Sequence, residues 1–327
     1  MITRRQILSG AGAIAGLSQL PHTAQAQTVG ASARILVGFP AGAGADNFAR
    51  RLAERLRGAY ATNLIVENRV GAGGRIAVSA LKGAVPDGTT LLLTPASMMV
   101  LFPLIYNNLG YDPVNDFVPV GTLSSVRLGL IVGNQVPARN LAEYVAWAKQ
   151  TRDRAVYASP GAGTMPHFLG SMFDIATGLG LQHVPYKGAA PARQDLLGGQ
   201  IPAYMGIIGS DIIQDHRAGR IRVLAVADPQ RSISLQDIPT FVEQGFKDVV
   251  AQEWLGLFLP AKTPAAVADA LGTQVRVALR HEDLTNPITN YAMVPGGEDG
   301  VALGRRVKEE QGRWAAAVKA SGFTPES

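Results

Sequence analysis

The stretch Phe39-Pro40-Ala41-Gly42-Ala43-Gly44-Ala45-Asp46 follows the apolar run Ile35-Leu36-Val37 and opens a segment of helical periodicity. A second stretch, Ser159-Pro160-Gly161-Ala162-Gly163-Thr164, follows Val156-Tyr157 in the same way. We call them the first elbow (39–46) and the second elbow (159–164). A strand that passes through glycines into a helix presents free N–H groups at the positive end of the helix dipole. Such a place suits an anion, usually a phosphate or a carboxylate. Two elbows therefore predict a ligand held from opposite sides by two lobes.

The first 26 residues are predicted to be an export signal and not part of the fold. Thr3-Arg4-Arg5-Gln6-Ile7-Leu8 fits the twin-arginine pattern, and Ala24-Gln25-Ala26 offers a cleavage site before Gln27. The apolar stretch between them, residues 7–20, is too short to span a membrane. We expect cleavage after Ala26 and a mature chain in the periplasm. An uncleaved N-terminal anchor is the alternative.

Composition narrows the classes of function. The chain has 327 residues, a net charge of +5 and no cysteine, which excludes disulfides and thiolate chemistry. Its Lys and Arg residues are scattered, whereas nucleic-acid binding needs a basic face, so no nucleic-acid partner is expected. The five histidines are isolated in the sequence and no H-E-x-x-H motif occurs, so we expect no metal site.

Strand and helix patterns alternate along the mature chain, which predicts an α/β fold with parallel sheets. The predicted strands are 34–39, 64–67, 90–94, 155–158, 181–185, 201–205 and 221–227. The predicted helices are 46–58, a short one ending at Gly83, 140–150, 166–177, 190–197, 210–218, one after Thr263-Pro264 and one through Arg313 and Trp314.

A long apolar stretch without a helix cap, residues 117–133, predicts a strand running from one lobe into the other. With a return crossing near residue 250, it divides the mature chain into two α/β lobes. Residues 27–127 and 251–327 are assigned to lobe 1, and residues 128–250 to lobe 2. Two crossings predict a hinge.

Several motifs have a structural interpretation beside a functional one. Gly42-Ala43-Gly44-Ala45-Asp46-Asn47 lacks the third glycine of a dinucleotide fingerprint, and no P-loop sequence occurs, so we expect no cofactor. Asp46 is interpreted as a helix N-cap more readily than as a catalytic acid. Ser159 and His167 suggest nucleophilic catalysis, but without a G-x-S-x-G elbow a capping or wall role is favoured.

Five further residues have alternative interpretations that stay open. Trp254, near the second crossing, is interpreted either as a core aromatic or as a lid over the ligand. Tyr186 and Lys187 place a phenol and an ammonium at the cleft, unless Lys187 is a solvated loop charge. Met98 and Met99 are interpreted as pocket wall or core.

Taken together, these segments resemble the substrate-binding proteins of tripartite tricarboxylate transporters, the TctC-like or Bug extracytoplasmic receptors. The resemblance covers essentially the whole mature chain. Its motifs are Phe39-Pro40 with Gly42, Asp46 with Ala49-Arg50, Val66-Glu67-Asn68-Arg69, Gly71-Ala72-Gly73-Gly74, Pro86-Asp87-Gly88-Thr89-Thr90-Leu91-Leu92, Tyr111-Asp112-Pro113, Asp116-Phe117, Ser159-Pro160-Gly161, Pro166-His167, Val184-Pro185-Tyr186-Lys187-Gly188, Leu196-Leu197-Gly198-Gly199-Gln200, Ile238-Pro239-Thr240, Gly245-Phe246 and Trp254 with Gly256-Leu257.

The resemblance implies a type II periplasmic-binding-protein fold, two α/β lobes joined by two hinge crossings and closing on a small organic carboxylate. It implies a monomer that is not an enzyme and that delivers its ligand to the integral-membrane permease subunits. A receptor of the same fold that signals to a sensor kinase is the alternative, and an exported α/β hydrolase is a rival of another class. The expected ligand-binding residues are Phe39, Pro40, Gly42, Ala43, Gly44, Ala45, Asp46, Thr94, Ser97, Ser159, Gly161, Gly163, Thr164, His167, Tyr186, Lys187, Ile207 and Ile208.

The chain departs from the family pattern at two places. Ala43 and Ala45 stand where the first elbow of relatives often has Gly and Ser or Thr, which removes a hydroxyl donor. Ile207 and Ile208 stand where relatives often carry Asp-Asn, which makes that wall apolar. We therefore expect a bulkier, more apolar carboxylate than a small polar amino acid.

Overall fold

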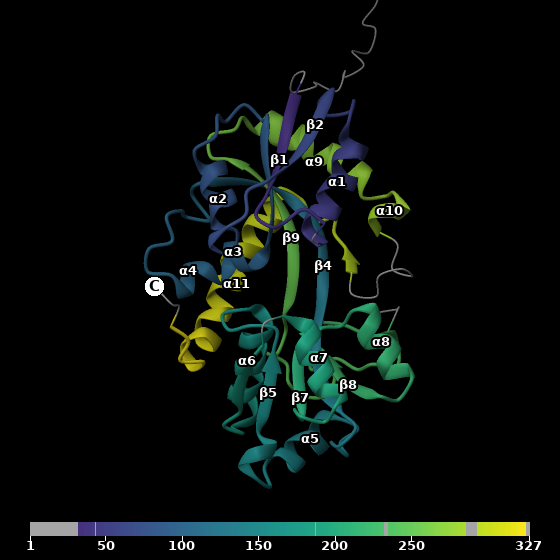
Figure 1. Ribbon diagram of the computed structural model, residues 1–327. Coiled ribbons are helices and arrows are strands. Elements are labelled where there is room, and N and C mark those ends of the chain that lie inside the picture. The colour runs from purple at the N-terminus through teal and green to yellow at the C-terminus, as the bar shows by residue number, and fades with distance from the viewer. Residues whose placement is uncertain (1–31, 43, 187, 232–234, 286–292, 325–327) are drawn as a thin grey trace, which may run out of the picture.

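The computed structural model describes residues 32–42, 44–186, 188–231, 235–285 and 293–324. Its strands form one continuous sheet in the order β2-β1-β3-β9-β4-β7-β5-β6, and β8 and β10 also pair with β4. Figure 1 shows the elements in two groups, with β1, β2, α1, α2 and α9 at one end and α5–α8 with β5, β7 and β8 at the other. The two long strands β4 and β9 run between the groups.

The first group is built on three parallel strands, β1 (Ser32–Val37), β2 (Asn63–Asn68) and β3 (Thr90–Pro95). β1 lies in the middle and pairs with both neighbours. The helices α1 (Gly44–Leu56) and α2 (Arg75–Lys82) connect them. The predicted apolar face of α1, with Phe48, Leu52 and Leu56, is buried against this sheet. The βαβαβ order expected from the sequence is confirmed here.

The strand β4 (Phe117–Gly133) has the bounds that the sequence predicts. Its first part pairs antiparallel with β9 (Gln252–Pro260), from Phe117 opposite Pro260 to Arg127 opposite Gln252. Its last part, from Leu128, pairs with β7 (Ala203–Ile207) and β8 (Ile221–Val226). One strand therefore serves both groups of the sheet. The change of partner falls at Arg127/Leu128.

The second group is again parallel at its centre, because β5 (Val156–Ser159) pairs in parallel with β6 (Gln182–Pro185) and β7. The helices of this group are α5 (Leu141–Ala148), α6 (Met165–Thr177), α7 (Ala189–Leu197) and α8 (Ser210–Arg217). Each lies within a few residues of its predicted range. β7 begins two residues later than predicted.

The last quarter of the chain returns to the first group. β9 inserts between β3 and β4, and α9 (Ala265–Ala278), α10 (Glu282–Thr285) and β10 (Met293–Pro295) follow. The long helix α11 (Gly300–Ala320) packs on β4, on the short helices α3 (Ala96–Val100) and α4 (Phe102–Ile105), and on α6 of the second group. Figure 1 shows it in yellow, running from beside β4 and β9 down towards α6.

Trp254 is a core residue. Its side chain is 0% exposed, it packs with Phe258, and its indole nitrogen donates to Glu310 Oε2 at 3.0 Å. Of the two interpretations of this residue, the core aromatic is correct and the lid is wrong. Met98 and Met99 are buried in the same apolar cluster.

Candidate functional site

The predicted site residues lie where parallel strands end. The first elbow follows β1, and Thr94 and Ser97 stand at the end of β3 and the start of α3. In the second group, the second elbow follows β5, Tyr186 follows β6, Ile207 ends β7 and Ile208 follows it. Ligands of open α/β sheets bind outside the carboxyl ends of the strands. The fold thus gathers those predicted residues that the structure describes at two such edges, one in each group.

Asp46 organises the first elbow from within. Gly42 has a φ of 83°, and its amide donates to Asp46 Oδ2 at 2.9 Å. Arg50 Nε donates to the same oxygen at 2.9 Å, and Asn68 Nδ2 donates to Oδ1 at 2.8 Å. Burial raises the pKa of the Asp46 carboxyl, but these hydrogen bonds outweigh burial and hold the pKa below its usual value. Asp46 therefore fixes the turn as an anion.

This role differs from the predicted one. Asp46 lies inside the first turn of α1, which begins at Gly44, and its carboxylate bonds an amide that precedes the helix. The N-cap interpretation of Asp46 is therefore wrong. Asn68 also donates to the Phe39 carbonyl at 2.9 Å, which ties the end of β2 to the elbow. Pro40 is exposed, Phe39 and Ala45 are half-buried, and Ala43 lies outside the described residues.

The second elbow is closed by its own side chains. The Gly161 carbonyl accepts from Ser159 Oγ at 2.9 Å and from Thr164 Oγ1 at 2.7 Å. Thr164 is the N-cap of α6 and accepts from the His167 amide. The Gly163 amide, at a φ of 73°, donates to His167 Nδ1 at 3.1 Å. The capping role expected for this region is thus carried by Thr164, and His167 holds the turn from inside α6.

Two stacked imidazoles stand behind this elbow. The rings of His167 and His183 lie 3.8 Å apart, and His183 Nε2 is 2.7 Å from Ser159 Oγ. Burial lowers the pKa of His167 to about 4 and that of His183 to about 3, where the neighbouring His167 contributes as well. Both rings are therefore neutral at pH 7. Because Nδ1 of His167 accepts a hydrogen bond, its proton is on Nε2.

The Ser–His pair expected in the hydrolase alternative is not the one that forms. Ser159 contacts His183 and not His167. Among the described residues, the structure gives neither ring a carboxylate partner that would orient it as a general base. This arrangement can form a rigid, neutral wall behind the elbow.

Glu253 joins the site without having been predicted. Its Oε1 accepts from the Ser97 amide at 3.0 Å, and the side chain is half-buried at the start of β9. Burial raises the pKa of Glu253 to about 7; the bonds from Ser97 oppose the shift and the charge of Glu310 adds to it. No local motif marks this residue, because its role depends on β9 inserting beside β3.

The remaining predicted site residues differ in their burial and in their hydrogen-bond partners. Thr94 is buried and its hydroxyl donates to Met98 Sδ at 3.2 Å. The Tyr186 hydroxyl donates to Asp195 Oδ2 at 2.7 Å; burial and this carboxylate raise the pKa of the phenol to about 12. Ile207 is 41% exposed, whereas Ile208 is 0% exposed in the core of the second group. Lys187 lies outside the described residues.

A chain of polar contacts spans the place where β4 changes partners. Arg127 and Asp228 form a buried ion pair at 2.9 Å. The other Asp228 oxygen accepts from Gln252 Nε2 at 2.9 Å, and Gln252 Oε1 accepts from Arg306 of α11 at 3.1 Å. Arg306 in turn pairs with Glu310 at 2.8 Å. These contacts connect β4, β9 and α11.

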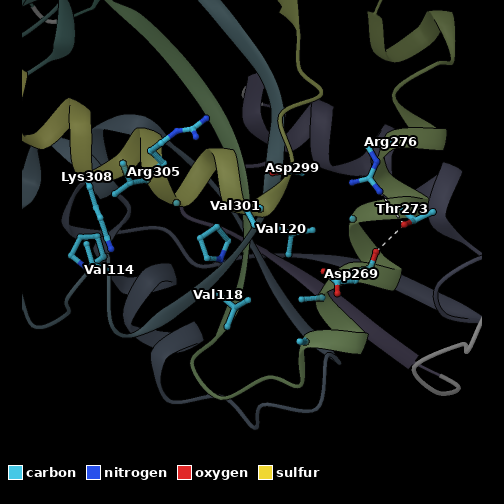
Figure 2. Close-up of a pocket in the computed structure, with 18 of the residues that line it drawn as sticks. Val114, Val118, Val120, Asp269, Thr273, Arg276, Asp299, Val301, Arg305 and Lys308 are labelled. Atoms are coloured by element: carbon cyan, nitrogen blue, oxygen red, sulfur yellow. Dashed lines mark hydrogen bonds between the residues drawn. The ribbon is translucent and has the colours of Figure 1, made fainter.

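A cavity of about 850 Å³ lies elsewhere, and none of its lining residues is a predicted site residue. Figure 2 shows Val118 and Val120 of β4 between α9, with Asp269, Thr273 and Arg276, and α11, with Val301, Arg305 and Lys308. Its cations and carboxylates are interspersed: Arg305 faces Glu309 at 3.9 Å, and Asp299 accepts from the Ala302 amide as the N-cap of α11. No residue of either elbow lines this cavity, so the cavity gives no support to the carboxylate site at the strand ends.

In the part of the chain that the structure describes, no group of three or more His, Cys, Asp or Glu side chains could hold a metal ion. None of the helices described there has the length and apolar character needed to cross a bilayer.

Solved structures with the same fold include periplasmic binding proteins. The periplasmic binding protein BugD is 31% identical, with a TM-score of 0.70 over 90% of this chain and 99% of BugD. A Rhodopseudomonas palustris protein with adipate is 29% identical, with a TM-score of 0.74 over 90% of this chain and 98% of its own. MatC of the same organism, with bound malate, is 27% identical, with a TM-score of 0.70 over 88% and 98%.

These likenesses confirm the expected type II periplasmic-binding-protein fold, with two α/β lobes joined by two crossings. The model of one protein family, described as the tripartite tricarboxylate transporter family receptor, matches residues 48–323. Its members are periplasmic binding proteins and not enzymes. The chain therefore belongs to the TctC family of tripartite tricarboxylate transporter receptors.

Proposed function

We propose that this receptor captures a small organic carboxylate between its two elbows and delivers it to a tripartite tricarboxylate-type permease. The observation that carries the proposal is that both elbows stand at the carboxyl ends of parallel strands and are held rigid by their own side chains. Structures of two relatives contain malate and adipate, which are both dicarboxylates.

The internal hydrogen bonds narrow down which amides are offered to the ligand. The amides of Gly42 and Gly161 donate within their own elbows, and that of Gly163 donates to His167 in the first turn of α6. Among the described residues, the amide of Ala162 has no protein acceptor. We assign this amide, with those of the first turn of α1, as the donors to the carboxylate. The three internal bonds then serve to aim them.

The expected affinity follows from such contacts. A hydrogen bond to a charged acceptor contributes about 1.5–3 kcal/mol, and a helix end adds roughly 0.3–1 kcal/mol. Several converging donors reach the roughly −8 kcal/mol of a micromolar complex. Binding of this strength is reversible, as delivery requires.

The wall near the end of β7 bears on the class of ligand. Ile207 is exposed at this edge and offers an apolar contact. A carboxylate with an alkyl chain or an aromatic ring would cover it, whereas a small polar amino acid would not. We therefore propose a ligand of the first kind.

The experiment is calorimetry with adipate, malate and benzoate, each compared with its uncharged amide. Micromolar binding of at least one acid, and none of its amide, is expected. Binding of an amide as tight as that of its acid would contradict a carboxylate site.

A pair of variants tests the backbone donors. Ala162→Pro removes the amide donor, whereas Ala162→Val also enlarges the side chain and keeps the N–H. Ala162 is exposed, so both variants should fold, which circular dichroism would verify. We expect at least a tenfold loss of affinity for Pro and little change for Val. Equal loss in both would show that bulk matters there and not the N–H.

The route to the periplasm and the lobe boundaries complete the proposal. Cleavage after Ala26 would give a mature protein that begins at Gln27, which mass spectrometry of the exported protein would test. Lobe 1 would comprise residues 27–127 and 251–327, and lobe 2 residues 128–250. Limited proteolysis should release lobe 2 as one continuous fragment, and cuts spread through 128–250 would contradict this division.

A further inference from the structure

The chain turns back on itself at the end of α11. Ser321 is the C-cap, and its hydroxyl donates to the Val318 carbonyl at 2.7 Å. Gly322 follows with a φ of 62°, the left-handed conformation common just beyond a helix end. The Phe323 amide then donates to Ser321 Oγ at 3.1 Å. This sharp turn brings the Phe323 ring back against α6.

The ring is placed against the second elbow. Phe323 lies edge-on to His167 and to Phe168, with ring centroids 5.9 Å apart in both pairs. A Cβ atom built on Gly163 would stand 2.8 Å from Cζ of Phe323. The para position of this ring therefore abuts the backbone of the elbow. A side chain at Gly163 would therefore displace this ring and would be strained at the positive φ.

These contacts meet at the hydrogen bond that holds the elbow. His167 Nδ1 accepts from the Gly163 amide at 3.1 Å. Phe323 packs on both the ring that accepts and the residue that donates. Its removal would free both groups to move, and the neighbouring Ala162 amide would lose its fixed direction.

The helix that carries Phe323 is anchored in the other group of elements. α11 packs on α3, α4 and β4, and Arg306 donates to Gln252 at the start of β9. α11 thus extends from the second elbow to the strands that connect the lobes. An elbow of lobe 2 is braced by a residue at the far end of the chain.

We propose that Phe323 is a positioning residue for carboxylate binding, which holds the second elbow in its binding conformation through His167 and Gly163. The inference rests on the proposed function for its effect on affinity. Its effect on the elbow itself needs no ligand.

The first test uses Phe323→Ala and a matched control. Phe246 is also partly buried and packs edge-on against Phe173 of the same helix α6, at 5.2 Å, but it has no part in the elbow. Hydrogen exchange of the Gly163 amide, followed by NMR in the ligand-free protein, is the readout. We expect exchange at least tenfold faster in Phe323→Ala and unchanged exchange in Phe246→Ala. Unchanged exchange in both, or equal acceleration in both, would overturn the proposal.

The second test measures affinity for the tightest acid found among adipate, malate and benzoate. Phe323→Ala should weaken binding about tenfold, and Phe323→Leu, which keeps much of the apolar volume, by no more than threefold. Phe323→Tyr should weaken binding too, because its hydroxyl would be added at the atom that abuts Gly163. A surface aromatic with no positioning role would tolerate Tyr, and wild-type affinity in both Tyr and Ala variants would refute the assignment.

The two proposals fail differently. If no acid binds the wild-type protein, the carboxylate function is wrong, and the exchange of Gly163 still decides the role of Phe323. If acids bind and Phe323→Ala leaves affinity and exchange unchanged, only the positioning role is wrong.

Discussion

Single residues in the site are predicted to give the protein an acid-sensitive stability. The pKa values of His167 and His183 lie near 4 and 3 in the folded protein, below the ordinary value of 6.5. A group with a lowered pKa binds fewer protons folded than unfolded, so its stabilisation is present above pH 6.5 and is lost as pH falls towards 4 and 3. Replacing His183 by Gln, which keeps a donor for Ser159, should flatten this loss. Urea unfolding between pH 7 and pH 4 measures it, and an unchanged slope would show that His183 does not titrate as described.

Glu253 is expected to have the opposite effect on how the stability of the protein changes with pH. Its pKa is raised from 4.5 to about 7, so it binds more protons folded than unfolded. Its stabilisation is fully present below pH 4.5 and is lost as pH rises through 7. Glu253→Gln keeps an oxygen for the Ser97 amide and should be more stable than wild type at pH 8, by roughly 1–3 kcal/mol. The difference should vanish at pH 4. The exposed Glu309→Gln is the control, and an equal gain there would point to net charge instead.

At the scale of single residues, the sequence predicts backbone turns but not which side chains contact one another. The elbows could be predicted because glycine patterns are local. The Ser159–His183 contact could not, since it arises from the pairing of β5 with β6 and joins residues 24 positions apart. Glu253 was missed for the same reason: 156 positions separate it from Ser97.

At the scale of elements, the first elbow and the start of α1 allow a test of whether the Asp46 hydrogen bonds stabilise the fold and support carboxylate binding. Asp46 is 1% exposed and accepts from Gly42, Arg50 and Asn68. Asp46→Ala leaves these donors without their acceptor, which should cost about 1–3 kcal/mol of unfolding free energy. Carboxylate affinity should fall as well, because the turn loses its brace. Thermal unfolding and calorimetry measure the two effects.

A matched variant separates the brace from general stability. Asp87 accepts from the Thr89 amide in a similar local turn, remote in sequence from either elbow. Asp87→Ala should lower stability without lowering affinity. Equal loss of affinity in both variants would contradict a specific role for Asp46.

Elements with a strong periodic pattern were predicted well, and short ones were not. The bounds of β4 agree at both ends because a long apolar run without caps is a clear signal. The helices α3 and α4 and the strand β10 have five, four and three residues, too few to show a period. They form because the surrounding elements pack around them, which sequence periodicity does not record.

For the whole molecule, two lobes joined by β4 and the start of β9 predict closure on binding. Small-angle scattering should give a smaller radius of gyration with a bound acid than without it. The corresponding amide serves as the control. An unchanged radius at saturating acid would contradict hinge closure.

Closure also depends on α11, because this helix is a third connection between the lobes beside β4 and β9. The helix contacts elements of both lobes, so any rotation must either carry α11 with lobe 1 and slide it over α6, or bend it. The passage of β4 from one lobe into the other could be predicted from sequence, whereas this third contact could not. It comes from tertiary packing between segments far apart in the chain.

The place of β9 in the sheet also decides the order in which the protein can be built. β9 lies between β3 and β4, yet its residues come more than a hundred positions after the end of β4. The strands β5 to β8, by contrast, are continuous in sequence. Contacts between distant segments form slowly because a long loop must close first. During refolding, amides of β5 and β7 should therefore become protected before those of β1 and β3, which pulsed hydrogen exchange would resolve. A nascent chain that has emerged only as far as residue 250 would hold a finished lobe 2 and a sheet in lobe 1 still open at the edge of β3, a surface on which another unfinished copy can pair.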